Sequence, residues 1–270
     1  MFFVSIERSL QWNYLYEIKL DSTYAYMAAN DRQIFLGWKS RIVVYNLDGT
    51  KYDQTRLQSS DIYGELCDLV WSSAMQMFFI LCRKSLFVHQ PSKGQIESIP
   101  NISLINQSNQ YVSMTTFQKH IALLNEQTLE LWKYSNSTFV FVYSIVMSCL
   151  LKNPLDEHIV SIRANDENLA VLIQVHSTHS WRLDLYNLFP FRRLHIGISF
   201  DQYEQINLGV FLSWEKNAYL FMNWETKSMR MIRDHGTNVV IDTQAYNACL
   251  ADTQRKLIVN YMTHLKVYEF

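Results

Sequence analysis

His176 and His179 have the spacing in this chain that most resembles a metal-binding motif. Two imidazoles three residues apart can share a metal ion if a third ligand comes from elsewhere. The pair lies between the apolar runs 168–175 and 181–186, with no carboxylate or thiol beside it. A polar hairpin turn facing water explains the pair better, because two ligands do not make a site. We therefore expect no bound metal.

Asp166 and Glu167 form the adjacent carboxylate pair that could suggest glycosidase chemistry. A glycosidase needs two carboxylates that face each other across a cleft. Neighbouring residues on a turn point apart, so a solvated turn is the better interpretation.

The four cysteines, Cys67, Cys82, Cys149 and Cys249, form no C-x-x-C pair. A zinc ribbon or a thioredoxin-type redox site is therefore unsupported. Their even number permits two disulfides, but their apolar neighbours favour four reduced and mostly buried thiols. Reduced thiols are typical of a cytoplasmic protein.

Glycine is scarce, with 7 residues that are well separated along the chain. A phosphate-binding loop needs several glycines close together, because the backbone must approach the phosphate without an intervening Cβ. The nucleophile elbow G-x-S-x-G is also absent. We therefore expect no catalytic residues, no cofactor and no enzyme activity.

Composition excludes further classes of protein. The chain has 270 residues, 24 Lys+Arg against 25 Asp+Glu, and 49% hydrophobic residues. This balance excludes intrinsic disorder and a charge-driven nucleic-acid binder. The longest apolar run, 139–151, is too short for a spanning helix, and the apolar start of the chain is too short for a signal peptide. We expect a cytoplasmic monomer that contacts neither nucleic acid nor membrane.

A repeat runs along the whole chain. Strand-like runs ending in short polar turns recur at intervals of 36 to 54 residues, marked by Tyr45, His89, Trp132, Tyr186, Ile232 and Tyr268. A period of about 40–50 residues is typical of propeller blades. Another apolar run precedes each marked run, a third opens each unit, and a fourth closes most units. Four strands per repeat predict one propeller blade each.

The ends of the chain predict how the ring closes. The sixth unit stops at Phe270 after its third strand, and residues 15–20 can supply the missing fourth strand. We therefore predict an all-β, six-bladed β-propeller of four-stranded antiparallel blades, with residues 1–270 as one domain. Pairing of the N- and C-terminal strands would remove the unpaired edge.

Alternative structures fit parts of the chain. Ile62, Leu66, Leu69 and Val70 match helical spacing. Residues 153–157 predict a small insertion with a helical turn, since Pro154 suits a first helical position. The few glycines leave hairpin turns to other residues, and a pair of β-sandwiches is the alternative fold.

Residues 33–52, QIFLGWKSRIVVYNLDGTKY, resemble one NHL-type blade. The resemblance rests on Arg41, Ile42, Val44, Tyr45, Asp48 and Gly49. The run TLELWKY at 128–134 resembles the third strand of a WD-repeat blade, although the Trp-Asp dipeptide and its upstream Gly-His are absent. The resemblance to a divergent NHL-repeat or WD-repeat-like propeller superfamily implies a propeller that binds macromolecules and carries out no chemistry.

Candidate binding residues follow from this topology, because turns between second and third strands share one rim of a propeller with the connections between blades. The predicted rim residues are Trp38, Lys39, Arg83, Lys84, Glu126, His176, His179, Trp224, Glu225 and His264. Most tryptophans are expected to pack between blades. Trp224, at a hairpin tip, is the expected anchor for a partner.

Three functions remain open. The preferred one is a non-catalytic protein-interaction scaffold that binds a protein or peptide at this rim. The second is a propeller-type hydrolase or lyase in the central channel, for which the opening strands offer only Asp68 and Arg163. Three or more converging ionisable groups there would favour the enzyme. The third is a fragment of a larger ubiquitin-ligase-like or scaffold protein.

Overall fold

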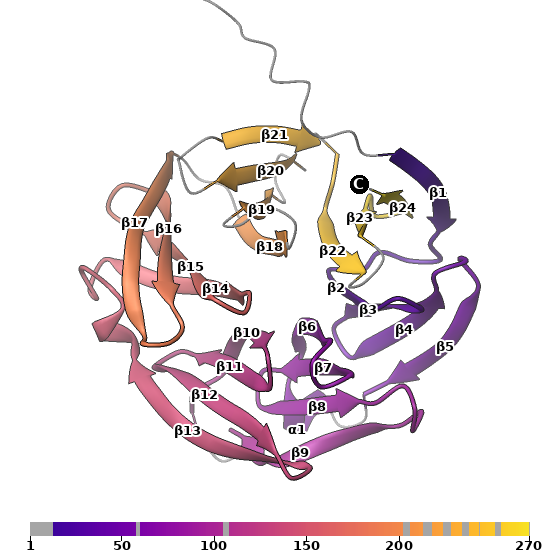
Figure 1. The fold of residues 1–270 in the computed structure, drawn as a ribbon, viewed down its shortest axis with the longest axis horizontal. Coiled ribbons are helices and arrows are strands. Elements are labelled where there is room, and N and C mark those ends of the chain that lie inside the picture. The colour runs from indigo at the N-terminus through magenta and orange to yellow at the C-terminus, as the bar shows by residue number, and fades with distance from the viewer. Residues whose placement is uncertain are drawn as a thin grey trace, which may run out of the picture.

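The computed structural model shows a ring of β-sheets around a central channel (Figure 1). It describes residues 13–57, 60–104, 108–201, 206–212, 218–223, 228–233, 238–242, 244–251 and 255–269. The strands of these ranges form six four-stranded sheets. Each sheet is one blade, and the blades are numbered one to six in the order of their first strands along the chain. The strands of a blade are called first, second, third and outer from the channel outward.

The strands occupy four positions along each blade. The first strands, which line the channel, are β2 (Tyr26–Ala29), β6 (Leu66–Ser72), β10 (Tyr111–Phe117), β14 (Glu157–Ala164), β18 (Ile206–Leu212) and β22 (Asn247–Ala251). The second strands are β3 (Gln33–Trp38), β7 (Met77–Cys82), β11 (His120–Asn125), β15 (Asn168–Val175), β19 (Ala218–Asn223) and β23 (Lys256–Asn260). The third strands are β4 (Arg41–Asn46), β8 (Ser85–His89), β12 (Thr128–Ser135), β16 (Ser180–Asn187), β20 (Ser228–Arg233) and β24 (His264–Glu269). The outer strands are β1 (Asn13–Lys19), β5 (Lys51–Arg56), β9 (Ile96–Ser103), β13 (Thr138–Val146), β17 (Arg192–Asp201) and β21 (Asn238–Asp242).

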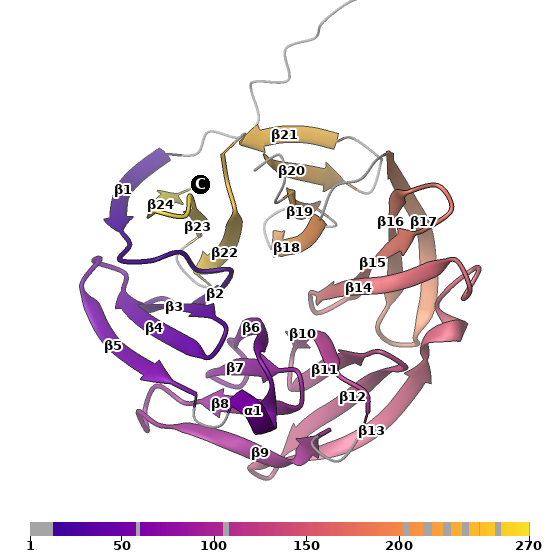
Figure 2. The same ribbon diagram turned by 180° about the vertical axis from the view of Figure 1, so that it is seen from behind.

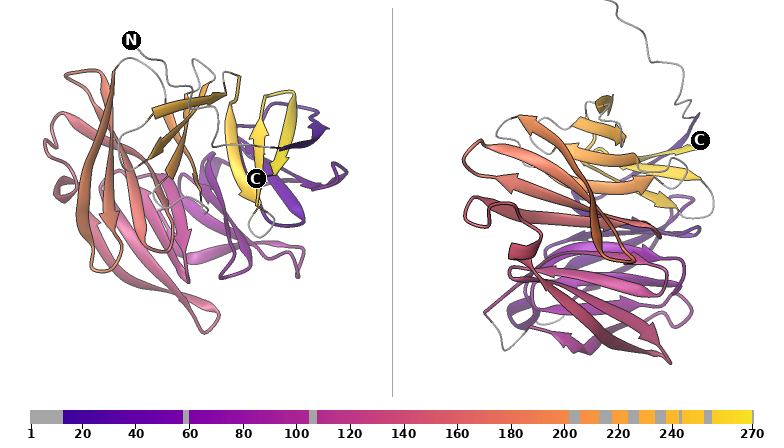
Figure 3. Two further views of the ribbon diagram at one scale, coloured as in Figure 1. Left: turned by 45° about the horizontal axis from the view of Figure 1, so that its top comes forward. Right: turned by 60° about the vertical axis from the view of Figure 1, so that its left-hand side comes forward.

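All neighbouring strands within a blade are antiparallel, as in the β2-β3-β4-β5 sheet. Each first strand contacts the first strands of both neighbouring blades, so the ring is continuous around the channel (Figure 2). The oblique views show the blades stacked side by side around this axis (Figure 3). The prediction of an all-β propeller with four-stranded antiparallel blades is confirmed.

Burial explains why the apolar runs occupy the second position. All six residues of β7, MFFILC, are buried, because neighbouring blades cover both faces of this strand. The outer strand β5, KYDQTR, is exposed along most of its length. A continuous apolar run therefore marks a strand buried on both faces, and a polar strand marks the outside of the ring.

The N-terminal strand closes the ring as the sequence predicts. β1 pairs antiparallel with β24 along Asn13–Lys19, two residues earlier than the predicted start. Leu20 N donates a hydrogen bond to Thr263 O at 2.8 Å. Ile18 is 2% exposed and lies in the core between the first and last blades. The closing strand is therefore held by side-chain packing as well as by backbone pairing.

Helical structure is slight in the described ranges. The helix α1 spans Ser60–Tyr63, and the strand β6 begins soon afterwards, so helical spacing beyond residue 63 does not produce a helix. The 3-10 helix η1 spans Met147–Cys149. The predicted helical turn at 153–157 is present as a single turn, in which Asn153 O accepts hydrogen bonds from Asp156 N at 3.0 Å and Glu157 N at 2.9 Å. No helix in the described part of the chain is long and apolar enough to cross a membrane.

The hairpin turns show how the chain manages with few glycines. Lys39, Gln118 and His179 adopt left-handed backbone conformations, with φ of 54°, 47° and 49°. This region is uncommon for residues with a Cβ other than Asn and Asp. Polar residues with longer side chains therefore occupy turn positions where a glycine would be expected.

Candidate functional site

The predicted rim exists, because backbone hydrogen bonds join the two kinds of turn that were expected to share it. Lys39 O accepts a hydrogen bond from Leu66 N at 2.8 Å, which ties a second-to-third-strand turn to the start of the next blade. His176 N donates to Asp156 O at 2.8 Å in the same way. We call the face formed by these turns and the connections between blades the hairpin rim.

Blades one and two give the hairpin rim its basic sector. Trp38 is 44% exposed, and Lys39 follows it at the tip of the turn. Arg83 is exposed, and its guanidinium donates to Gln110 Oε1 at 3.3 Å. Lys84 Nζ donates to Asn109 O at 2.8 Å, so this ammonium group supports the neighbouring connection. Trp38, Lys39 and Arg83 are therefore the exposed members of this sector, and Lys84 is partly buried.

Blades three and four place histidines and an acid on the same rim. Glu126, His176 and His179 are exposed. The pKa of His158 is lowered, mainly by burial and to a lesser extent by the nearby His176, although the charge of Glu126 acts in the opposite direction. The turn at His176–His179 faces water as the sequence predicts. In the described ranges, no group of three or more His, Cys, Asp or Glu side chains could hold a metal ion.

The remaining rim candidates belong to blades five and six. His264 is partly buried, stacks on Tyr261 at a centroid distance of 5.1 Å, and lies 3.9 Å from the Glu17 carboxylate. Lys266 Nζ lies 4.6 Å from the centre of the Tyr261 ring. Trp224 and Glu225 lie outside the described residues, so the expected anchor is not placed.

The other tryptophans mostly pack inside the ring. Trp181 is 6% exposed in the core between blades four and five. The ring of Trp71 lies 4.6 Å from that of Phe78 in the core between blades one and two. Trp132 is partly buried and contacts Phe141 edge-on at 5.3 Å. Trp214 lies outside the described residues. Trp38 is the exception among the tryptophans that are described.

A cavity of about 290 Å³ lies in the central channel. It is lined by the first strands of five blades, and its lining extends to turns between first and second strands at Ser73, Asp166 and Arg255. Those turns are at the other end of the first strands from the hairpin rim. The cavity therefore reaches the face opposite the predicted binding residues, which sequence reasoning did not anticipate.

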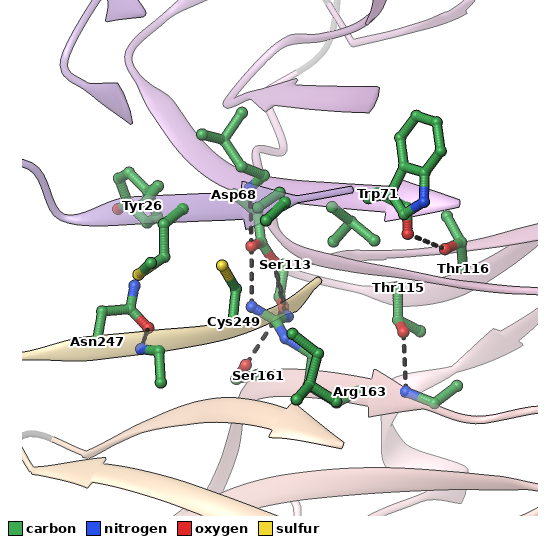
Figure 4. A pocket seen from close by; sticks show the side chains of 18 of the residues that line it. Tyr26, Asp68, Trp71, Ser113, Thr115, Thr116, Ser161, Arg163, Asn247 and Cys249 are labelled. Atoms are coloured by element: carbon green, nitrogen blue, oxygen red, sulfur yellow. Dashed lines mark hydrogen bonds and ion pairs between the residues drawn. The ribbon is translucent and has the colours of Figure 1, made fainter. Parts of the chain in front are cut away.

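The most connected side chains of the cavity are Asp68 on β6 and Arg163 on β14 (Figure 4). Arg163 Nη1 and Nη2 donate to Asp68 Oδ2 at 2.8 Å and Oδ1 at 2.9 Å, a two-point contact. Asp68 also accepts hydrogen bonds from the backbone N of Leu69 and Met114 and from Ser113 Oγ. Since Ser113 and Met114 belong to β10, one carboxylate joins three consecutive blades.

Smaller polar side chains extend this inter-blade network. Ser113 Oγ lies 3.3 Å from Ser161 Oγ, and Thr115 Oγ1 accepts a hydrogen bond from Ala164 N at 2.8 Å. The charged lining residues are Asp68, Arg163, Asp166 and Arg255. Two of these four neutralise each other, and Asp166 Oδ1 accepts from Gln118 N at 3.1 Å. The network is suited to fixing the blades against one another.

A second buried ionic cluster lies within blade four. Arg182 donates to Glu157 Oε1 at 2.5 Å and to Asp184 Oδ1 at 3.0 Å, and Asp184 is fully buried. Burial raises the pKa of Glu157, but the hydrogen bonds from Arg182 and from the backbone at Lys152 and Asn153, together with the charge of Arg182, outweigh it, so the pKa is lowered. Alternation in WRLDLY, with Arg182 and Asp184 on one strand face, is the sequence signal that could have indicated this pair.

The cysteines and the carboxylate pair behave as predicted. All four cysteines are free thiols; Cys67, Cys82 and Cys249 are buried and Cys149 is exposed. Burial raises the pKa of Cys82 to about 12 and also raises that of Cys249. Asp166 and Glu167 are exposed on the turn between β14 and β15. None of these groups has the environment of an activated nucleophile.

Comparison with known proteins identifies the fold and no closer relationship. No protein-family model matches the chain, and no curated protein matches it. A protein of the mitotic checkpoint complex matches with a TM-score of 0.60 and 7% identity, over 97% of this chain and 96% of that one. Virginiamycin B lyase from Staphylococcus aureus matches with a TM-score of 0.57 and 10% identity, over 96% and 100%.

A third similar structure is much longer than this chain. PorZ, an essential surface component of the type-IX secretion system of Porphyromonas gingivalis, matches with a TM-score of 0.52 and 9% identity. The match covers 96% of this chain but 39% of PorZ. Together with the ring of blades, these similarities define the fold of the chain as a β-propeller. At such low identities they show the fold alone.

Proposed function

We propose that this closed six-bladed propeller is a non-catalytic interaction scaffold that binds a protein or peptide on its hairpin rim. The observation that carries the proposal is Trp38, a half-exposed indole at the end of β3 beside a rigid turn. Tryptophan is enriched among the residues that dominate binding energy at interfaces. Loops held by a rigid scaffold are also where recognition residues concentrate.

Charge on the rim favours a partner with an acidic segment. Lys39 and Arg83 are exposed on neighbouring blades next to Trp38, and Glu126 begins the histidine-containing sector farther along the ring. A basic sector with an exposed aromatic side chain suits a peptide that combines carboxylates with an apolar residue. The proposal places the chain in the cytoplasm, either as an independent propeller or as one propeller of a larger scaffold.

The test is quantitative affinity capture with the full chain and its variants. Trp38→Ala should remove most of the captured partner, since truncating a central anchor costs about 2 kcal/mol or more. Lys39→Glu should weaken capture and change its salt dependence. Phe189→Ala, which removes a half-exposed aromatic ring from a turn between third and outer strands, is the matched control. Capture that survives both rim changes would place binding on another face.

The central channel supports a second candidate, a hydrolase or lyase. It is favoured by the cavity of about 290 Å³ and its four charged lining side chains. It is weakened by Asp68, whose carboxylate already accepts hydrogen bonds from four residues and so is poorly placed to act as a base. A crystal grown with cell extract would discriminate: a small molecule bound between Asp166 and Arg255 would favour the channel.

A further inference from the structure

The outer strand β13 differs from the other outer strands in carrying no charged side chain against edge-to-edge pairing. Its sequence, TFVFVYSIV, contains no charged residue, proline or glycine. Each of the other outer strands carries at least one charge, at Lys19, Lys51, Glu97, Arg192 and Asp242. Charges and proline on an edge strand are the usual means of preventing association through its backbone.

The side chains of β13 are also unusually apolar for an outer surface. Val140, Phe141, Val142 and Val146 are between 45% and 54% exposed. β13 is the last strand of its sheet, so in the described part of the chain no further strand pairs with its outward edge. Asn101 Nδ2 donates a hydrogen bond to Phe139 O at 2.6 Å, and the backbone groups farther along that edge are placed to pair with another extended segment. An uncharged β-strand is therefore the partner that fits this edge best.

A second copy of this chain supplies a strand that fits. Pairing β13 antiparallel with itself about a two-fold axis at Val142 places Val140 opposite Ser144 and Thr138 opposite Val146. No charge faces another charge in this register, and apolar side chains meet on both sides of the axis. Any other outer strand of a second copy would bring a charged side chain against the apolar ones of β13.

A local irregularity in β13 agrees with an axis at this position. Trp132 pairs with Phe141 and Leu131 pairs with Tyr143, so Val142 is an additional residue with no partner on β12. Such a bulge bends the strand and divides it into two short segments. An axis through Val142 pairs the first segment of one copy with the second segment of the other, and the two bulges lie opposite each other.

We propose that β13 joins two copies of this chain in a symmetric dimer through antiparallel β13–β13 pairing centred on Val142. This replaces the monomer expected from the sequence and is independent of binding on the hairpin rim. One strand per copy makes a small interface, which places the dimer among weak and transient assemblies. The dimer would join blade three of one ring to blade three of the other (Figure 1).

Sedimentation equilibrium on the full chain tests the dimer. The wild type should dimerise with a dissociation constant in the micromolar range. Val142→Lys and Val142→Glu should each raise that constant by about tenfold or more, because each places like charges opposite one another across the axis. Tyr52→Lys, which adds the same charge to the exposed outer strand β5, is the matched control and should leave it unchanged.

Mixing the two variants gives the decisive result. An equimolar mixture of Val142→Lys and Val142→Glu should recover the wild-type constant within about threefold, since opposite charges then meet at the axis. Thermal melts of each variant show whether the rings remain folded. A monomeric wild type at about 100 μM, undiminished association of Val142→Lys, or no recovery in the mixture of folded variants would each overturn the proposal.

Discussion

At the residue scale, the Asp68–Arg163 pair links blades that are distant in sequence. Asp68→Asn should lower the free energy of unfolding by about 3 kcal/mol, because it leaves the Arg163 guanidinium partly buried without its carboxylate partner. Urea denaturation measures this loss. Asp53→Asn, the same change on the exposed strand β5, should shift stability by less than about 0.5 kcal/mol. Equal effects of the two changes would show that the Asp68–Arg163 pair does not stabilise the contact between blades.

Asp21 predicts a pH dependence of stability. Hydrogen bonds from Lys51 and then Tyr24, with the charges of Lys51 and Arg41, lower the pKa of Asp21 to about 2. A lowered pKa contributes stability that is complete above the unfolded value of about 3.9 and is lost as pH falls towards 2. Because the side chain is 41% exposed, the contribution should be below about 1 kcal/mol.

The test compares the free energies of unfolding of the wild type and Asp21→Asn. The stability difference between wild type and variant should be constant above pH 5, shrink between about pH 4 and pH 2, and decrease in high salt. Chemical denaturation at several pH values measures it. A difference that stays the same across this acid range would mean that the folded-state pKa is not lowered.

At the scale of elements, ring closure by β1 depends on a few buried contacts. Ile18→Ala should cost about 2–4 kcal/mol, because the side chain is 2% exposed in the core between the terminal blades. Leu15→Ala on the same strand, at 37% exposure, should cost much less. Removing residues 1–19 should leave β24 as an open edge and lower the melting temperature sharply. An unchanged melting temperature would show that β1 does not close the ring.

One glycine also acts at this scale, through the approach of two blades. A Cβ at Gly37 on β3 would collide with the Leu66 side chain at the start of β6. A larger residue would force Leu66 to shift, so glycine is favoured here by the close approach of two blades and not by its backbone conformation. This explains one of the few glycines that the chain contains.

At the scale of the whole molecule, a closed ring should unfold as one unit. Cys67 on β6 and Cys249 on β22 are buried in different blades and are separated along the chain. Their labelling by a thiol reagent in low denaturant should report the same opening free energy for both, equal to that of global unfolding. Cys149, which is exposed, should react at once. A lower opening free energy at Cys249 alone would show that the last blade opens separately.

The sequence by itself determined the architecture. Apolar runs such as MFFILC must be buried on both faces, and their recurrence about every 45 residues leaves few folds other than a propeller. The missing fourth strand of the last unit likewise indicated pairing of the chain ends. The predicted rim also followed from topology, since alternate turns of an antiparallel blade lie at the same end. The 3-10 helix at Met147–Cys149 was not predicted, because short helices depend on local packing more than on propensity.

Only the tertiary structure decided which side chains meet. Asp68 and Arg163 are 95 residues apart, and nothing in their local sequence specifies that they pair. The same holds for the exposure of Trp38 and Val142, while other apolar residues on similar strands are covered by a neighbouring blade. The alternation of apolar and polar residues shows which side chains of a strand share a face. Whether another blade covers such a face depends on the twist of the sheets and on the closing of the ring, which involve contacts between residues far apart in the chain.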